Sequence, residues 1–275
     1  MKIALGNQMI NTQGTLDERL RQAREAGFDG VEFWLGTPDV TMESTDEEVG
    51  ELAETLRECS LQCSSIASTL GWGHPITSPD DEVFERAVAV GCRQVDVARI
   101  CNADAILVVT GRVLPEVPWR QAWDRMVEGF RRICDYAMEH RIRVGAETCP
   151  SLSKNLMTPG ECAAFVSAVA RPNIGIYLDI ANVLYSGYPR DFIRELGDRI
   201  VRIHAKDREE PGPGGKGRAT WPGNGIVDWK AVCEACADAG YDEWAVLEFP
   251  PPEGQKYGPD VARRACEDAR KAFNC

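Results

Sequence analysis

Short apolar runs alternate with longer amphipathic segments along the whole chain. The apolar runs have the length of buried strands, and the apolar positions between them recur with helical spacing. Each run is followed by one such amphipathic segment, so the pattern predicts eight strand–helix units. The predicted strands span residues 2–5, 30–35, 62–67, 105–110, 143–147, 174–179, 200–204 and 244–248.

The amphipathic segments carry local signals that mark where helices begin and end. Ser44 and Glu47 are spaced as a capping box, and Thr158 is followed by Pro159, which suits the first helical position. Gly27 and Gly240 follow two of the segments and are expected to end them. The predicted helices span residues 16–26, 44–58, 79–101, 118–140, 158–170, 190–196, 228–239 and 258–273.

This alternation predicts an α/β fold that is a single (β/α)8 TIM barrel. Strict βα alternation implies a parallel sheet, and eight units in 275 residues match a closed barrel over the whole chain, residues 1–275. The alternative is an open doubly wound sheet, but residues 6–8 after the first strand do not form the glycine-rich fingerprint of dinucleotide-binding folds. The long segment 208–226, rich in Gly and Pro, is predicted to be a lid loop.

Charge and composition narrow the functional classes. The formal net charge of −12 argues against a nucleic-acid partner, and no apolar run approaches the roughly 20 residues that cross a membrane. The N-terminus is predicted to be a first strand rather than a signal peptide, so the eleven cysteines are expected to be thiols in the cytoplasm. The sequence leaves the oligomeric state open, a homo-oligomer included.

Four consecutive predicted strands end in residues that can bind a metal, namely Glu147, Asp179, His204 and Glu248. In a barrel the C-terminal ends of the strands meet at one face, so these side chains are expected to converge there. Three carboxylates that close together would repel one another unless a cation lay among them. Three oxygen donors and one imidazole suit Mn²⁺, Mg²⁺ or Co²⁺. The alternative is that these residues only terminate strands or cap helices.

The chain resembles the xylose-isomerase-like TIM barrels, the sugar (phosphate) isomerase/epimerase group, over nearly its whole length. The resemblance implies one divalent metal ion, Mn²⁺ or else Mg²⁺ or Co²⁺, held by Glu147, Asp179, His204 and Glu248. It also implies that Glu147 and Glu248 are catalytic and move protons beside a carbonyl through an enediolate, as in a sugar isomerase or epimerase. The resemblance rests on residues 30–33, Glu147, Leu178 with Asp179, residues 196–200, 204–207 and 223–229, and Leu247 with Glu248.

Departures from the ketose 3-epimerase pattern keep a second activity open. Asn182 stands where these enzymes have a histidine, and Glu210 stands where they have an arginine, with Arg208 nearby. The sequence His204-Ala205-Lys206-Asp207 resembles the branch that contains inosose dehydratases. A lyase on the same site is therefore the alternative, either an inosose-type dehydratase or an enzyme that cleaves keto-glycosides by elimination.

The substrate is expected to be a small sugar or cyclitol bound at the same face. The candidate substrate-binding residues lie on strands or loops there: Lys206, His74, Trp34, Glu32, Asn182 and Arg208. A salt bridge to Asp207 or to a neighbour is the other interpretation of Lys206, and core packing is the other interpretation of Trp34. An abasic-site endonuclease is disfavoured because its metal cluster needs more than three histidines, and a sugar-binding module without turnover is the remaining alternative.

Overall fold

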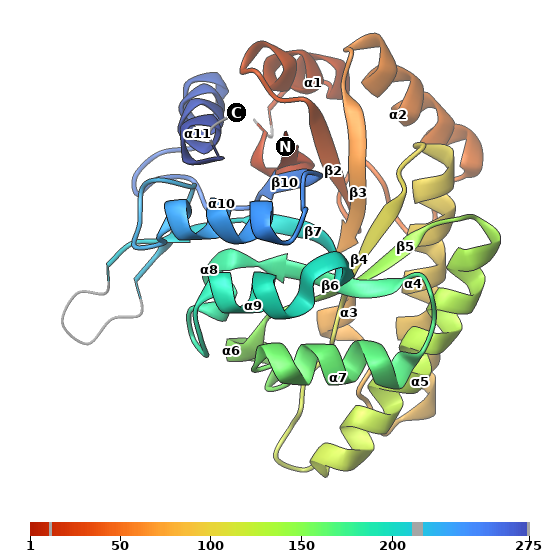
Figure 1. Cartoon of the computed structure of the whole chain (residues 1–275). Helices are drawn as coiled ribbons and strands as arrows, with labels where there is room; N and C mark the ends of the chain where they lie inside the picture. The colour runs from red at the N-terminus through yellow and green to blue at the C-terminus, as the bar shows by residue number, and fades with distance from the viewer. Residues whose placement is uncertain (11–12, 211–216, 274–275) are drawn as a thin grey trace.

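Eight parallel strands form a closed barrel in the computed structural model, which describes residues 1–10, 13–210 and 217–273 (Figure 1). The strands are hydrogen-bonded around the barrel in the order β1-β10-β7-β6-β5-β4-β3-β2. The predicted TIM barrel is therefore confirmed. The barrel strands are β1 (Lys2–Gly6), β2 (Gly30–Leu35), β3 (Gln62–Ser68), β4 (Ala105–Val109), β5 (Arg143–Glu147), β6 (Ile174–Asp179), β7 (Ile200–Ala205) and β10 (Trp244–Leu247).

A helix follows each barrel strand and covers the outside of the sheet (Figure 1). Every helix expected from the sequence is present. Within the described ranges, no helix has the length and apolarity needed to cross a membrane. The covering helices are α1 (Leu16–Glu25), α2 (Asp46–Glu58), α4 (Asp81–Ile100), α5 (Trp119–Glu139), α7 (Pro159–Val169), α9 (Pro189–Leu196), α10 (Trp229–Asp238) and α11 (Pro259–Phe273).

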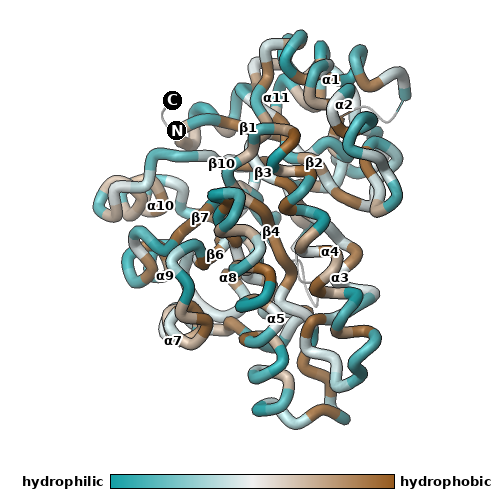
Figure 2. The backbone as a smooth tube through the Cα atoms, turned by 90° about the vertical axis from the view of Figure 1, so that its right-hand side faces the viewer, coloured by the Kyte–Doolittle hydropathy of each residue, from teal (hydrophilic) through white to brown (hydrophobic). Residues whose placement is uncertain are grey.

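The strands are buried on both faces, which explains why they are continuously apolar in sequence. Every residue of β2, β4, β6 and β7 is buried, and hydrophobic colour follows the strands in Figure 2. One apolar layer lies between the sheet and the helices. A second, smaller layer fills the barrel interior with Ala4, Trp34, Ala67, Leu107, Val109, Tyr177, Trp244 and Val246.

The start of α2 differs from the sequence prediction by one residue. The capping box is formed by Thr45 and Glu48, not by Ser44 and Glu47. The Glu48 amide donates to Thr45 Oγ1 at 3.2 Å, and the Thr45 amide donates to Glu48 Oε2 at 2.7 Å. Ser44 instead accepts a hydrogen bond from the Thr41 amide at 3.1 Å in the preceding turn. Both registers satisfy the spacing rule, and the turn at residues 41–44 decides between them.

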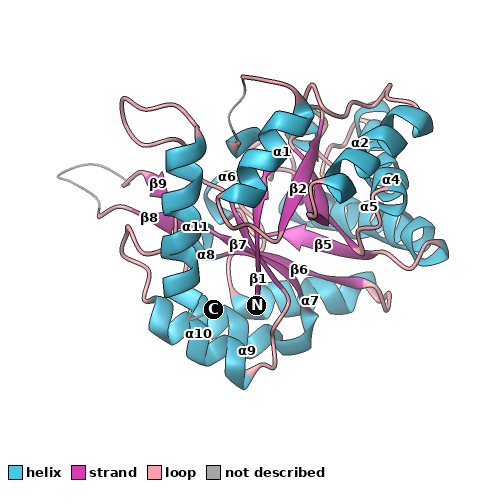
Figure 3. Cartoon of the chain, turned by 90° about the horizontal axis from the view of Figure 1, so that it is seen from above, coloured by secondary structure: helices cyan, strands magenta, loops and turns pink. Residues whose placement is uncertain are grey.

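Short elements that the sequence pattern did not reveal follow several strands. They are the 3₁₀ turn η1 (Asn7–Met9) and the single-turn helices α3 (Leu70–Gly73), α6 (Pro150–Ser153) and α8 (Ile180–Val183). After β7, strands β8 (Asp207–Arg208) and β9 (Ala219–Thr220) pair antiparallel beside α11 (Figure 3). Of the predicted lid 208–226, residues 211–216 lie outside the described residues. All of these elements lie at the C-terminal ends of the strands, where a barrel carries its active site.

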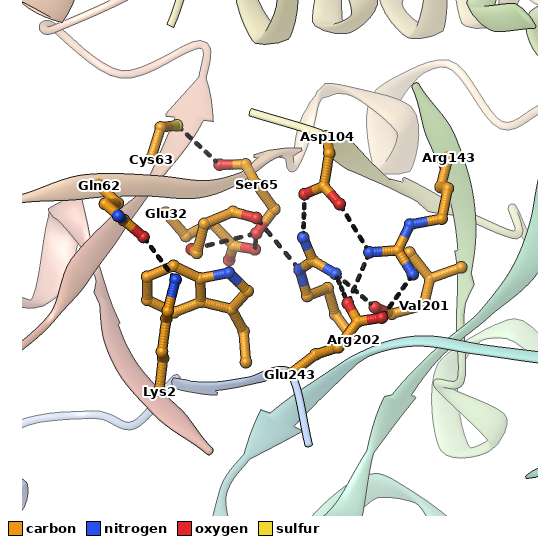
Figure 4. A network of polar contacts seen from close by, with 12 residues as sticks. Lys2, Glu32, Gln62, Cys63, Ser65, Asp104, Arg143, Val201, Arg202 and Glu243 are labelled. Atoms are coloured by element: carbon orange, nitrogen blue, oxygen red, sulfur yellow. Dashed lines mark hydrogen bonds and ion pairs between the residues drawn. The ribbon is translucent and has the colours of Figure 1, made fainter. Parts of the chain in front are cut away.

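A buried arginine closes the opposite end of the barrel. Arg202 on β7 is only 1% exposed, and it forms ion pairs with Asp104 before β4 and Glu243 before β10 (Figure 4). It also donates to the Ser64 carbonyl at 3.1 Å. Arg143 at the start of β5 pairs with the same two carboxylates, at 2.7 and 2.5 Å. The network joins five strands, β3, β4, β5, β7 and β10, at their N-terminal side and leaves the other face free for chemistry.

Candidate active site and metal centre

The four expected metal-binding residues lie together at the C-terminal face of the barrel. Glu147 and Asp179 end β5 and β6, His204 lies on β7, and Glu248 directly follows β10. Each offers one ligand atom, and these atoms all lie within 4.8 Å of one another. The register explains the convergence, because His204 is paired with Asp179 on one side and with Val246, two residues before Glu248, on the other.

His204 points one nitrogen at the three carboxylates. Its Nδ1 lies 3.3 Å from Glu248 Oε2, 3.5 Å from Glu147 Oε1 and 3.9 Å from Asp179 Oδ2. Within the part of the chain that the structure describes, this buried Nδ1 has no hydrogen-bond partner, and Asp179 Oδ2 accepts no hydrogen bond although it forms an ion pair with Lys206. Buried polar atoms are nearly always satisfied, so an unpartnered Nδ1 that faces three carboxylates fits a cation between them. The donor set fits a hard or borderline divalent ion.

Local backbone structure aims Asp179 into the cluster. Asp179 is the N-cap of α8, and its Oδ1 accepts a hydrogen bond from the Asn182 amide at 2.8 Å. Its own amide donates to Thr148 Oγ1 at 2.9 Å. These two bonds hold the side chain so that Oδ2, the oxygen that does not cap α8, faces His204. One oxygen of the carboxylate therefore caps α8, and the other is the candidate ligand atom.

Lys206 lies at the edge of the same cluster. Its Nζ is 2.8 Å from Glu248 Oε2 and 2.7 Å from Asp179 Oδ2, although the second contact lacks hydrogen-bond geometry. Burial works to lower the pKa of Lys206, but Asp179 and Glu248 outweigh it and raise the pKa. The salt bridge expected as the alternative role of Lys206 forms with the neighbours Asp179 and Glu248. It does not form with Asp207, which accepts four hydrogen bonds from the segment that follows β7 and from Trp229.

The two glutamates differ in exposure and in acidity. The Glu147 side chain is 7% exposed and that of Glu248 is 22% exposed. Burial raises the pKa of Glu147. Burial acts on Glu248 in the same direction, but Lys206 and His204 outweigh it, so the pKa of Glu248 is lowered.

Glu248 also borders a cavity of about 380 Å³ together with Lys206, Phe249 and Tyr257. A larger cavity of about 690 Å³ lies at the other end of the barrel, next to Lys2 and Asp104, and is remote from this chemistry.

Metal binding is expected to release protons near neutral pH. Burial lowers the pKa of His204, but Glu32, Glu147 and Glu248 outweigh it and raise the pKa well above its ordinary value. A raised pKa favours the protonated imidazole in the metal-free protein, and a metal can bind only the neutral form. We therefore expect a divalent metal such as Mn²⁺ to release protons as it binds, with an affinity that rises with pH. Titration calorimetry in buffers of different ionisation enthalpy measures this release.

The same pKa fixes how the stability of the metal-free protein depends on pH. A raised pKa in the folded state means that the protonated imidazole stabilises the fold. That contribution is complete below the unfolded value, about 6.5, and it is lost as the pH rises through the folded value. Proton uptake on metal binding, or a metal affinity that falls as the pH rises, would contradict a raised pKa of His204.

The other nitrogen of His204 faces a buried carboxylate. His204 Nε2 lies 3.0 Å from Glu32 Oε1, and Glu32 Oε2 accepts hydrogen bonds from Tyr177 at 2.5 Å and Ser65 at 2.7 Å. Trp34 stacks parallel to the imidazole with ring centroids 6.2 Å apart. Of the expected substrate-binding residues, Glu32 and Trp34 thus lie against His204, and Glu32 is fully buried.

The remaining expected substrate-binding residues are Asn182, Arg208 and His74, which differ in whether they contact the cluster. Asn182 is 8% exposed and donates to the Thr148 carbonyl at 3.2 Å. Arg208 on β8 stacks over the Tyr185 ring at 4.7 Å and donates to the Gly217 carbonyl. His74 ends α3 and borders a separate small cavity beside β4. Lys206 and Asn182 therefore contact residues of the cluster, whereas Arg208 and His74 contact other parts of the chain.

Sequence reasoning missed Tyr177 and Ser65. Tyr177 is fully buried inside the barrel, and its ring lies edge-on to His204 with centroids 4.6 Å apart. The signal was present, because Tyr177 is two residues before Asp179 and residues two apart on a strand share one face. Ser65 shares a face with Ala67 of the inner layer in the same way.

Comparisons with known proteins agree with this architecture. The fructoselysine 3-epimerase of Shigella flexneri is 20% identical over 240 residues, which cover 85% of each chain. The inosose dehydratase of Lacticaseibacillus casei is 26% identical over 140 residues, 46% of each chain. A solved structure of an L-ribulose 3-epimerase superposes with a TM-score of 0.83 at 19% identity, over 99% of this chain and 94% of that one. The model of the xylose isomerase-like TIM barrel family matches residues 20–266. The chain belongs to the xylose isomerase-like TIM barrel family.

Proposed function

We propose that this protein is a divalent-metal-dependent sugar isomerase or epimerase. The observation that carries the proposal is the cluster of Glu147, Asp179, His204 and Glu248 at the face where this fold places active sites, in which His204 Nδ1 has no hydrogen-bond partner among the described residues. Relatives named as sugar epimerases support the substrate class. Sugars and cyclitols are small polar molecules, and the cavity of about 380 Å³ beside Glu248 suits one.

The cofactor in this proposal is one divalent metal ion. A set of three carboxylates and one imidazole favours Mn²⁺, with Mg²⁺ and Co²⁺ as alternatives. When bound, the ion would supply Lewis acidity to a carbonyl oxygen of the substrate. His204 contributes the single nitrogen ligand, and the three carboxylates contribute oxygen and balance the charge of the ion.

Glu147 and Glu248 carry the proton transfers. One carboxylate removes the proton from the carbon beside the carbonyl, and the substrate passes through an enediolate. The other carboxylate returns a proton to the opposite face, which gives epimerisation, or a proton moves to the adjacent atom, which gives aldose–ketose exchange. Glu248 is the more exposed of the two and borders the cavity, so it has the more direct access to a substrate.

Substrate contacts in the proposal come from Lys206 at the cavity and from side chains next to the cluster. Lys206 is buried beside Glu248 and presents its ammonium to a hydroxyl or carbonyl oxygen. Asn182 is next to the cluster, where its backbone amide donates to Asp179. Trp34 offers an apolar wall next to the imidazole. Arg208 and His74 would contact only the distal parts of a substrate.

A dehydratase-type lyase is the second candidate, and the position of Lys206 favours it. Its ammonium is 2.8 Å from Glu248 Oε2. After a carboxylate takes the proton beside the carbonyl, Lys206 can donate a proton to a leaving β-hydroxyl or glycosyl oxygen, which departs with the bonding electrons. The presence of asparagine at position 182 removes an imidazole that a 3-epimerase would use there. The similarity to an inosose dehydratase is consistent with this candidate.

A deuterium-exchange screen tests the proposal. The Mn²⁺-loaded protein is incubated in D₂O with ketoses, inososes and keto-glycosides, and substrates are recovered for NMR and mass spectrometry. We expect at least one compound to take up solvent deuterium beside its carbonyl. Uptake with an isomeric product identifies the isomerase or epimerase, whereas net loss of water or aglycone identifies the lyase.

Two controls make the screen decisive. Protein treated with EDTA should show no uptake, and added Mn²⁺ should restore it. Absence of exchange throughout the three compound classes, from protein that calorimetry shows to be metal-loaded, would count against both candidates. In that case the sugar-binding module without turnover becomes the better interpretation.

A further inference from the structure

We propose that Glu32 is a positioning residue for the metal centre, which fixes the proton of His204 on Nε2 and so presents Nδ1 to the metal. The inference rests on the proposed function, because it concerns the same metal site. It assigns Glu32 a role behind the histidine rather than contact with the substrate.

Three side chains of the described residues contact the Glu32 carboxylate. Glu32 is fully buried on β2, and its Oε1 lies 3.0 Å from His204 Nε2. Its Oε2 accepts hydrogen bonds from Ser65 on β3 and Tyr177 on β6. Figure 4 shows Glu32 and Ser65 pointing toward each other inside the barrel. Two hydroxyl donors and one ring nitrogen therefore occupy the carboxylate, and His204 stands between it and the metal-binding carboxylates.

These contacts determine the tautomer of the neutral imidazole. A carboxylate accepts hydrogen bonds and cannot donate one, so Nε2 must carry the proton for the 3.0 Å contact to be a hydrogen bond. The lone pair is then on Nδ1, the atom that faces Glu147, Asp179 and Glu248 and has no partner. Histidine ligands commonly donate their second N–H to a carboxylate in this way, which orients the ring and raises its basicity.

Two aromatic rings fix the plane of the His204 imidazole. The remaining role of the Glu32 carboxylate is to determine which ring nitrogen carries the proton. Trp34 stacks on His204 at an interplanar angle of 8°, and Tyr177 contacts it edge-on at 4.6 Å. A ring confined in this way cannot turn over without displacing both neighbours. The packing thus predicts that loss of the Glu32 charge changes the affinity for metal more than it changes the fold.

Metal affinity tests the proposal without any measurement of turnover. We expect Glu32→Gln to weaken Mn²⁺ binding about 10-fold and Glu32→Ala about 100-fold, measured by calorimetry on metal-free protein. Tyr177→Phe, which removes one donor to Glu32 and keeps the ring, is the matched control and should weaken binding less than Glu32→Ala. Urea unfolding of the metal-free variants checks that the fold persists.

The tautomer itself can be observed by NMR on the wild-type protein. The chain has only three histidines, so ¹⁵N-histidine labelling gives few imidazole signals, and His204→Asn identifies those of His204. In protein loaded with diamagnetic Zn²⁺ or Mg²⁺ we expect the His204 proton on Nε2 and the metal on Nδ1. The reverse assignment overturns the proposal, whether or not the Glu32 variants fold. Wild-type Mn²⁺ affinity in Glu32→Gln overturns it as well, while a wild-type protein that binds no metal overturns the proposed function with it.

Discussion

Replacing either glutamate of the proposed acid–base pair with glutamine is expected to lower turnover by roughly 10²- to 10⁴-fold, the usual contribution of a general acid or base. Glu147→Gln and Glu248→Gln keep the shape and one carbonyl oxygen of each side chain but remove its ability to accept a proton. Steady-state turnover of whichever compound exchanges deuterium, at saturating Mn²⁺, measures the loss. Glu253→Gln, an exposed glutamate on the segment that follows Glu248, is the matched control and should keep wild-type activity.

Isotope exchange distinguishes the roles of the two glutamates. If one carboxylate removes the proton and the other returns it, one variant should still exchange the substrate proton with D₂O and form no product. The other variant should lose both exchange and product formation. Metal affinity is measured alongside, since both residues also belong to the metal cluster. Near-normal turnover in both variants would exclude these carboxylates as the acid and base.

Replacing the buried arginine at the other end of the barrel is expected to cost about 3 kcal/mol of unfolding free energy. Arg202→Met keeps the apolar stem but removes the charge from a buried ion-pair network, which typically costs a few kcal/mol. Asp104 and Glu243 are partly solvent-exposed, at 59% and 40%, so water limits the loss. In a chain of this size the melting temperature should fall by roughly 10 °C.

Arg143 provides a matched control for this experiment. It pairs with the same two carboxylates, but its side chain is 33% exposed. Exposed ion pairs contribute at most about 1 kcal/mol, so Arg143→Met should destabilise the protein much less than Arg202→Met. Urea titration of both variants at constant metal concentration compares them. Equal losses would show that burial of Arg202 is not what makes the network stabilising.

The fold was predictable because the pattern is local and repeated. Each buried strand is a short apolar run in the sequence. Each covering helix has apolar positions at helical spacing and its own capping residues. The errors are local too. The capping box moved from Ser44 to Thr45 because a turn stabilised by Thr41 competes for Ser44. Single-turn elements such as α3 and α8 are too short to show a period, so the pattern did not reveal them.

The convergence of the four candidate metal ligands was also predictable, for a topological reason. In a parallel barrel every strand ends at the same face, so ligand residues at the ends of neighbouring strands must meet. Glu147, Asp179, His204 and Glu248 satisfy that rule from sequence positions alone, and the structure brings their ligand atoms within 4.8 Å. Tyr177 obeys the same alternation and was missed only because an apolar strand offers several inward side chains.

The sequence by itself determined the barrel and the set of side chains proposed to bind metal, because both follow from neighbouring positions and strand order. Only the tertiary structure decided which polar side chains pair with one another. Glu32 meets His204 across 172 residues, and Lys206 pairs with Asp179 and Glu248 rather than with adjacent Asp207. Arg202 finds Asp104 and Glu243 at the opposite end. Such partners depend on strand register and on the stagger of the closed barrel, which no local pattern in the chain encodes.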